Sequence, residues 1–104
     1  MKIKLFCNAG MSTSMLVNKM KKVVEEKGLD IEIIAFPVTA MEEEAKDCDI
    51  VLLGPQVKYL LDHAIKICEP KKVPVTTINM QDYGLMQGEK ILDAALKIHA
   101  DYNK

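Results

Sequence analysis

Long apolar runs are missing from this sequence, and their absence limits how it can relate to a membrane. Clean runs such as Ile50 to Leu53 are far shorter than the roughly 20 residues that a membrane-spanning helix needs. The N-terminal segment MKIKLF carries charge but has neither a long apolar stretch nor a small-residue cleavage site, so no signal peptide is expected. We therefore expect a cytoplasmic protein that is not itself embedded in a membrane.

An excess of charge of one sign is also missing. The formal net charge is −1, and the lysines are not gathered into a basic stripe. Binding to nucleic acid or to an anionic lipid surface through overall charge requires such an excess, so neither partner is expected.

The sequence has only three cysteines, and their spacing does not match a metal site. Cys7, Cys48 and Cys68 are 41 and 20 residues apart, which fits neither a zinc ribbon nor a C-x-x-C redox motif. An odd count without a signal peptide favours reduced thiols. Neither His63 nor His99 has a second ligand at metal spacing, so the sequence predicts no metal and no cofactor.

The residues that are present suffice for one folded domain. The chain has 104 residues, of which 49% are hydrophobic and 28% charged, enough for a core and a solvated surface. No linker or low-complexity stretch divides it, so we predict a single domain over residues 1–104.

Strand and helix patterns alternate along the chain. Short apolar stretches that end at Gly, Pro or Asn predict strands, and apolar residues at helical spacing predict helices. The predicted strands are Lys2–Phe6, Asp30–Phe36, Asp49–Leu53 and Val73–Ile78. The predicted helices are Ser12 or Thr13 to Glu26, Thr39–Lys46, Gln56–Cys68 and Gly84–Asp101.

Individual residues refine these boundaries. Gly28 is expected to end the first helix in a left-handed conformation, and Thr39 with Glu42 forms a capping-box pattern at the second helix. Pro74 lacks an N–H, which favours an edge position for the last strand. The segment Asn79 to Tyr83 is predicted to be a polar loop.

Strict alternation of strand and helix predicts an α/β fold with one four-stranded parallel sheet and helices on both faces. The expected spatial order of the strands, numbered along the chain, is 2-1-3-4. Ligands bind such sheets at the carboxyl ends of the strands, where the order reverses. That point lies between the first and third strands, so the loops beginning at Cys7 and at Gly54 are expected to meet there.

The loop after the first strand carries the residues with chemistry. It reads Cys7, Asn8, Ala9, Gly10, Met11, Ser12, Thr13 and Ser14. A helix N-terminus offers free N–H donors and positive potential to an anion, and the same potential favours a thiolate nucleophile. Gly10 allows the loop to curl, and the three hydroxyls add donors. This pattern predicts a cradle for a phosphoryl group, with Cys7 as the nucleophile.

A plainer interpretation of these residues stays open at this point. A cysteine at a strand end is often a small buried hydrophobe, and Gly followed by Ser and Thr is often only a helix start. Cys48 and Cys68 fall at or near apolar positions, so both are expected to be inert thiols.

The sequence closely resembles enzyme IIB of the lactose, cellobiose and chitobiose branch of the bacterial sugar phosphotransferase system. The resemblance covers essentially the whole chain. It rests on Cys7 to Ser14, on Leu53-Gly54-Pro55-Gln56-Val57 and on Asp82-Tyr83-Gly84-Leu85. It implies a flavodoxin-like fold, similar to that of low-molecular-weight tyrosine phosphatases, and a phosphotransferase acting in sugar transport. By resemblance, Cys7 accepts phosphate from a phosphohistidine of enzyme IIA and passes it to a sugar held by the membrane subunit, enzyme IIC.

The alternative function is a small tyrosine phosphatase, because the loop is also similar to the C-x5-R-[ST] phosphate loop of those enzymes. Here the position of the arginine is Thr13. Arginine binds the equatorial oxygens of the transition state through two parallel hydrogen bonds. Its absence therefore weakens hydrolysis and favours a carrier.

The further candidate members of the site are Gln56, Asp82 and Tyr83. Gln56 is expected either to contact the Cys7 loop or a partner, or to be a solvated residue at a helix start. The pair Asp82-Tyr83 is similar to the acidic loop in which such phosphatases keep a general acid. Asp82 is therefore expected either to be a general acid or, as the simpler interpretation, to cap the next helix. Met11 is expected to be partly exposed.

The resemblance favours cellobiose, lactose or chitobiose as the sugar, with cellobiose first, and we expect a monomer.

Overall fold

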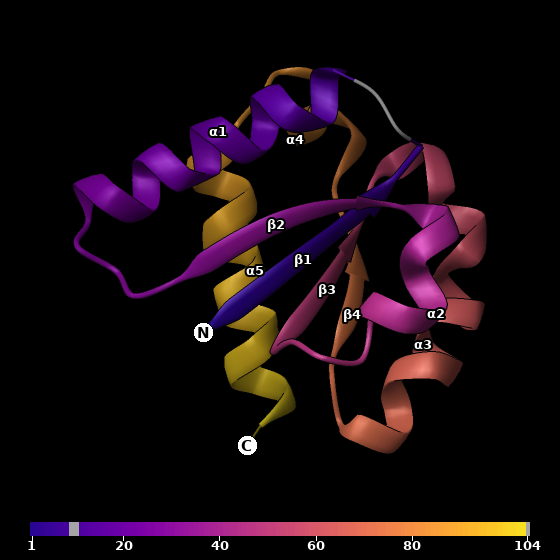
Figure 1. The fold of residues 1–104 in the computed structure, drawn as a ribbon. Helices are drawn as coiled ribbons and strands as arrows, with labels where there is room; N and C mark the ends of the chain where they lie inside the picture. The colour runs from indigo at the N-terminus through magenta and orange to yellow at the C-terminus, as the bar shows by residue number, and fades with distance from the viewer. Residues whose placement is uncertain (9–10, 104) are drawn as a thin grey trace.

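The computed structural model describes residues 1–8 and 11–103, and its centre is a parallel sheet (Figure 1). The strands are β1 (Lys2–Cys7), β2 (Glu32–Pro37), β3 (Ile50–Leu53) and β4 (Val75–Thr77). The α-helices are α1 (Met11–Glu26), α2 (Met41–Glu44), α3 (Leu61–Cys68), α4 (Met80–Gly84) and α5 (Gly88–Tyr102). Short 3-10 helices are η1 (Val38–Ala40), η2 (Pro55–Leu60) and η3 (Glu69–Lys71).

The strand order β2-β1-β3-β4 confirms the predicted topology, with β4 at an edge. Helices α1 and α5 cover one face of the sheet, and α2 and α3 cover the other (Figure 1). Every pairing is parallel, as crossover connections through helices require.

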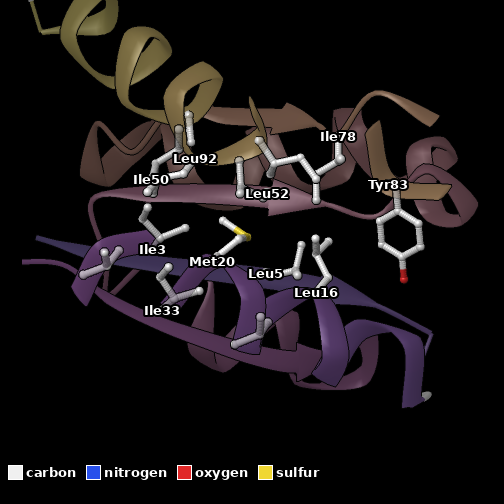
Figure 2. Packing of buried hydrophobic residues seen from close by; sticks show 14 residues of the cluster. Ile3, Leu5, Leu16, Met20, Ile33, Ile50, Leu52, Ile78, Tyr83 and Leu92 are labelled. Carbon is white, nitrogen blue, oxygen red and sulfur yellow. The ribbon is translucent and has the colours of Figure 1, made fainter. Parts of the chain in front are cut away.

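Two apolar clusters, one on each face, hold these layers together. Ile3 and Leu5 of β1 face α1 and α5, whereas Phe6 faces α2 and α3. Figure 2 shows Leu16 and Met20 of α1 lying against the strands in the first cluster. All four residues of β3 are buried, as expected for a strand covered on both faces.

Backbone hydrogen bonds align the ends of β1, β3 and β4. The N–H of Gly54 donates to the carbonyl of Phe6 at 2.9 Å, and the N–H of Ile78 donates to the carbonyl of Leu53 at 2.8 Å. The segments that follow β1, β3 and β4 therefore begin at the same edge of the sheet, where the predicted site lies.

The prediction of a polar loop over 79–83 is wrong, because α4 occupies most of that segment. The side-chain oxygen of Asn79 accepts the N–H groups of Gln81 at 2.8 Å and Asp82 at 3.1 Å. This cap satisfies the first free donors of the short helix. Met86 then has a positive φ of 54°, which ends the helical path, so α5 begins at Gly88 rather than near Gly84.

Two other helices differ from their predicted form. The predicted helix Gln56–Cys68 is divided into η2 and α3, because Pro55 opens a 3-10 turn and Val57 has non-helical backbone angles (φ −118°, ψ 24°). The predicted cap at Thr39 is wrong, since neither η1 nor α2 has a side-chain cap bond. Gly28 has φ +65°, which confirms the left-handed end of α1.

A lysine is buried within β1. Lys4 is 3% exposed, and its Nζ donates to the carboxylate of Glu44 at 3.0 Å and to the carbonyl of the same residue at 2.9 Å. The ammonium also lies 5.3 Å from the centre of the Phe36 ring. These contacts compensate a charge that burial would otherwise destabilise, and they attach α2 to the sheet.

Glu44→Ala should lower the free energy of unfolding by about 1 kcal/mol, because it leaves Lys4 with less compensation, while partial exposure of the carboxylate limits the loss. Denaturant unfolding measures it. Lys4→Met, which removes charge and keeps length, should change stability by less than about 1 kcal/mol. Glu43→Ala on the exposed side of α2 is the control, expected within about 0.5 kcal/mol of the parent. A loss in the control equal to that in Glu44→Ala would contradict a role for the ion pair.

Candidate phosphoryl-transfer site

Cys7 is the last residue of β1, at the carboxyl edge of the sheet and one strand away from Leu53, where β3 ends. Its side chain is 3% exposed. Its thiol donates to the carbonyl of Asn8 at 2.9 Å. The sequence prediction that this cysteine stands at the switch point is confirmed by the strand order.

A hydroxyl group contacts the sulfur. Oγ1 of Thr13, a residue of α1 that is 4% exposed, lies in hydrogen-bond contact with Sγ of Cys7. Oη of Tyr83, from α4, lies 3.1 Å from the same Oγ1. Figure 2 shows the Tyr83 ring at the end of the first apolar cluster with its hydroxyl directed away from it. Three segments of the chain thus meet through Cys7, Thr13 and Tyr83.

The structure describes only some of the remaining residues of the loop. Helix α1 begins at Met11, four residues after Cys7, so the expected helix N-terminus follows the cysteine. Asn8 and Ser14 are exposed. Ala9 and Gly10 lie outside the described residues, and the structure does not describe the side chains of Met11 and Ser12, so the predictions for these positions stay predictions.

Gly54 allows the two central loops to approach each other closely. A Cβ on Gly54 would stand 3.0 Å from Cβ of Cys7 and 3.0 Å from Oε1 of Gln56. The exposed Gln56 side chain therefore folds back over Gly54 on the side of Cys7. Its predicted role toward the loop or a partner stays a prediction.

Asp82 does not cap the next helix, because it lies inside α4, and the N-cap residue of α5 is Gln87, without a side-chain cap bond. Its half-buried side chain borders a pocket of about 120 Å³ together with Thr76 and Ile98. The structure brings its neighbour Tyr83, rather than Asp82 itself, into contact with the Cys7–Thr13 pair.

The other two cysteines have a different environment. Burial raises the pKa of Cys48 and of Cys68 to about 11. Both sulfurs contact the carbonyl of Ala45, at 3.3 and 3.4 Å. A raised pKa disfavours the thiolate, in agreement with the expectation that both are inert. His63 is more than half exposed, and its Nε2 lies 3.7 Å from the carboxylate of Glu42.

Positive charge from arginine is absent from the chain as a whole. All 14 basic residues are lysines. No guanidinium from another part of the chain can therefore replace the arginine that is missing at Thr13. The donors that the loop itself offers to an anion are backbone N–H groups and hydroxyls.

The fold and this loop define a class of protein. They form a parallel α/β sheet whose switch-point loop joins a cysteine at a strand end to a helix N-terminus, an arrangement suited to holding a phosphoryl group. More particularly, the chain belongs to the lactose/cellobiose-specific IIB subunits of the sugar phosphotransferase system (PTS), whose family model matches residues 2–94.

Individual relatives agree with this assignment. The chain is 44% identical over 98 residues to the galactose-specific EIIB component of Lactococcus lactis subsp. cremoris, covering 89% of this chain and 91% of that protein. It is 43% identical to the cellobiose-specific component of Lactococcus lactis subsp. lactis, with the same coverage. The oligo-beta-mannoside-specific component of Bacillus subtilis is 37% identical, over 93% of this chain and 94% of that protein.

Solved structures show the same fold. The cellobiose-specific IIB component of Borrelia burgdorferi superposes with a TM-score of 0.80 at 39% identity, over 98% of this chain and 94% of the other. The lactose-specific IIB domain of Streptococcus pneumoniae superposes with a TM-score of 0.85 at 15% identity, over 94% of this chain and 96% of the other. At this identity the similarity shows the fold alone.

The protein is thus a phosphocarrier and phosphotransferase of PTS sugar transport, as the resemblance implied. The phosphatase alternative receives no support from these relatives. Among the described residues, none of the helices is both long and apolar enough to cross a membrane.

Gly54→Ala should slow uptake of the phosphoryl group by about tenfold, because the new methyl group displaces Cys7 by a few tenths of an ångström. Overpacking should also lower the free energy of unfolding by about 1–2 kcal/mol. Gly84→Ala is the control, since nothing lies within 4 Å of a Cβ there. Uptake is measured by mass spectrometry over time; equal rates in Gly54→Ala and in the parent would show that close packing at Gly54 is unimportant.

In the folded protein at pH 8, iodoacetamide should leave Cys48 and Cys68 unmodified while it modifies both in denaturant. A thiol with a pKa of about 11 is about 100-fold less ionised at this pH than one at the ordinary 9.0. Peptide mass spectrometry gives the modified fraction of each cysteine. Rapid native modification of Cys68, which is fully buried, would contradict the described packing.

Proposed function

We propose that Cys7 is the residue that carries the phosphoryl group. In this proposal it accepts the group from a phosphohistidine of enzyme IIA and gives it to a sugar bound by the membrane subunit, enzyme IIC. The observation that supports it most strongly is the position of Cys7: its sulfur lies at the switch point of the sheet, beside the N-terminal turn of α1 and in contact with the hydroxyl of Thr13.

Each transfer is an in-line displacement. In the first, the Cys7 thiolate attacks phosphorus, an S–P bond forms, and the electron pair of the breaking N–P bond stays on the histidine. In the second, a sugar hydroxyl oxygen attacks phosphorus, the S–P electron pair returns to sulfur, and the hydroxyl proton passes to a base on the acceptor side. Backbone N–H groups of Asn8 to Ser14 spread the charge of the phosphoryl oxygens.

The chemistry of the loop favours a carrier over a hydrolase. A phosphatase needs strong stabilisation of the transition state for attack by water, for which a bidentate arginine is suited. This chain has no arginine, and Thr13 supplies a neutral hydroxyl instead. A phosphocysteine held this way is expected to survive in water until the acceptor arrives.

The sugar and the setting remain part of the proposal. The relatives named for cellobiose and oligo-beta-mannoside support a β-linked sugar, and among such sugars we propose cellobiose first. The relative named for galactose, a monosaccharide, does not add to this choice. We further propose that residues 1–104 form one IIB domain that acts in the cytoplasm as a monomer, because a single face around Cys7 has to serve both partners in turn.

Incubation with phosphoenolpyruvate and the upstream PTS proteins should add about 80 Da, the mass of one phosphoryl group, to the tryptic peptide that contains Cys7. Cys7→Ser should lose the adduct, whereas the matched control Cys48→Ser should keep it. An adduct on Cys48 or Cys68 in the parent protein would overturn the assignment. Sustained turnover of an aryl phosphate that depends on Cys7 would instead favour the phosphatase.

A further inference from the structure

The contact between Tyr83 and Thr13 has no part in the mechanism above, although both side chains are buried, at 6% and 4% exposure. The two hydroxyls lie 3.1 Å apart and join segments 70 residues apart in sequence. Thr13 also contacts the Cys7 sulfur. One threonine hydroxyl therefore bridges a tyrosine and the cysteine.

The direction of these hydrogen bonds follows from counting protons. The thiol proton of Cys7 is directed to the carbonyl of Asn8, which can only accept. With the thiol proton directed to that carbonyl, the donor in the contact with sulfur is the single hydroxyl proton of Thr13. With that proton used, the Thr13 oxygen can only accept from Tyr83, so Tyr83 is the donor in the second contact.

The same direction holds for the thiolate. A sulfur that carries negative charge accepts hydrogen bonds and cannot donate, so the order Tyr83 to Thr13 to Cys7 is kept when the proton leaves. Hydrogen bonds to a charged acceptor are stronger than those between neutral groups, and successive bonds polarise one another. The chain of hydroxyls thus stabilises the sulfur most when it is negatively charged.

We propose that Tyr83 is a positioning residue for the chemistry of Cys7, acting through Thr13 by holding the threonine proton on the sulfur. This inference rests on the proposed function, in which Cys7 carries the phosphoryl group. When the S–P bond breaks toward the sugar, its electron pair goes to sulfur, and Thr13 stabilises the new thiolate by donation without transferring its proton. Tyr83 in turn donates to the Thr13 oxygen without transferring its proton.

The surroundings of Tyr83 suit this role. Its ring belongs to the first apolar cluster, and α4 is fixed by the Asn79 cap. The backbone N–H of Tyr83 donates to the carbonyl of Asn79 at 2.9 Å. The hydroxyl is thus presented to Thr13 from a capped helix whose tyrosine ring is packed in the core, which lowers the entropic cost of orienting the threonine.

Alkylation of Cys7 by iodoacetamide at pH 7.5 tests the proposal without any phosphoryl donor. Tyr83→Phe, which removes only the hydroxyl, should slow alkylation about threefold, and Thr13→Val about tenfold, in line with the loss of single hydrogen bonds to a charged group. Tyr102→Phe, at an exposed tyrosine near the end of α5, is the matched control and should react at the parent rate.

A double variant separates positioning from packing. If Tyr83 acts through Thr13, adding Tyr83→Phe to Thr13→Val should change the rate by less than about twofold, because the pathway is already broken. Thr13→Ser, which keeps the hydroxyl, should retain most of the reactivity and the response to Tyr83→Phe. A purely structural role would instead loosen the site, expose the buried sulfur and speed alkylation.

Several results would overturn the inference. An unchanged or faster rate in Tyr83→Phe would do so, as would independent effects of the two substitutions in the double variant. Should Thr13→Val fail to fold, Tyr83→Phe in the parent and in Thr13→Ser still decides the matter. Because alkylation needs no phosphoryl transfer, failure of the inference is distinguishable from failure of Cys7 to take up phosphate.

Discussion

The hydrogen bond from the N–H of Gly54 to the carbonyl of Phe6 is the contact on which the site depends. It continues the pairing of β1 and β3 beyond the end of β3 and brings the segment after β3 against Cys7. A glycine is needed there, because a Cβ would meet Cβ of Cys7 at 3.0 Å. The two apolar clusters on either side keep these central strands in register, so the core of the fold and the position of the sulfur are set together.

The chemical character of the site follows from what surrounds that sulfur. In the proposed site, hydroxyls and helix N–H groups take the place of a cationic clamp, in a chain that has lysines but no arginine. Neutral donors stabilise a thiolate and a bound phosphoryl group less strongly than a guanidinium does. We infer that this moderate stabilisation suits a carrier, which has to release its phosphoryl group to a sugar and not to water.

The sequence was sufficient for the topology and for the place of Cys7 at the switch point, because both follow from the alternation of strands and helices. Alternating strands and helices predict the order 2-1-3-4, and the switch point then selects the loop after the first strand. It was insufficient for α4, since a five-residue helix has too few turns to show periodicity. The division of the third helix depends on non-helical backbone angles at Val57, which its apolar spacing hides.

Contacts between residues far apart in the sequence were the hardest to predict. Tyr83 was a candidate only through its neighbour Asp82, and nothing in its local sequence indicates Thr13, 70 residues earlier. Likewise, the burial of Lys4 depends on Glu44, which a helix 40 residues later brings to it. Such pairs are created by packing of whole elements, so they emerge only when the layers are assembled.

The lifetime of the phosphorylated protein tests the central claim most directly, namely that the folded loop holds a phosphoryl group on Cys7 without hydrolysing it. Phosphorus NMR can follow the S-linked signal of the folded, phosphorylated chain in the absence of acceptor and compare its decay with that of the same chain unfolded in urea. The account predicts that folding does not accelerate the loss of phosphate to water. Faster release of inorganic phosphate from the folded chain than from the unfolded chain would contradict it.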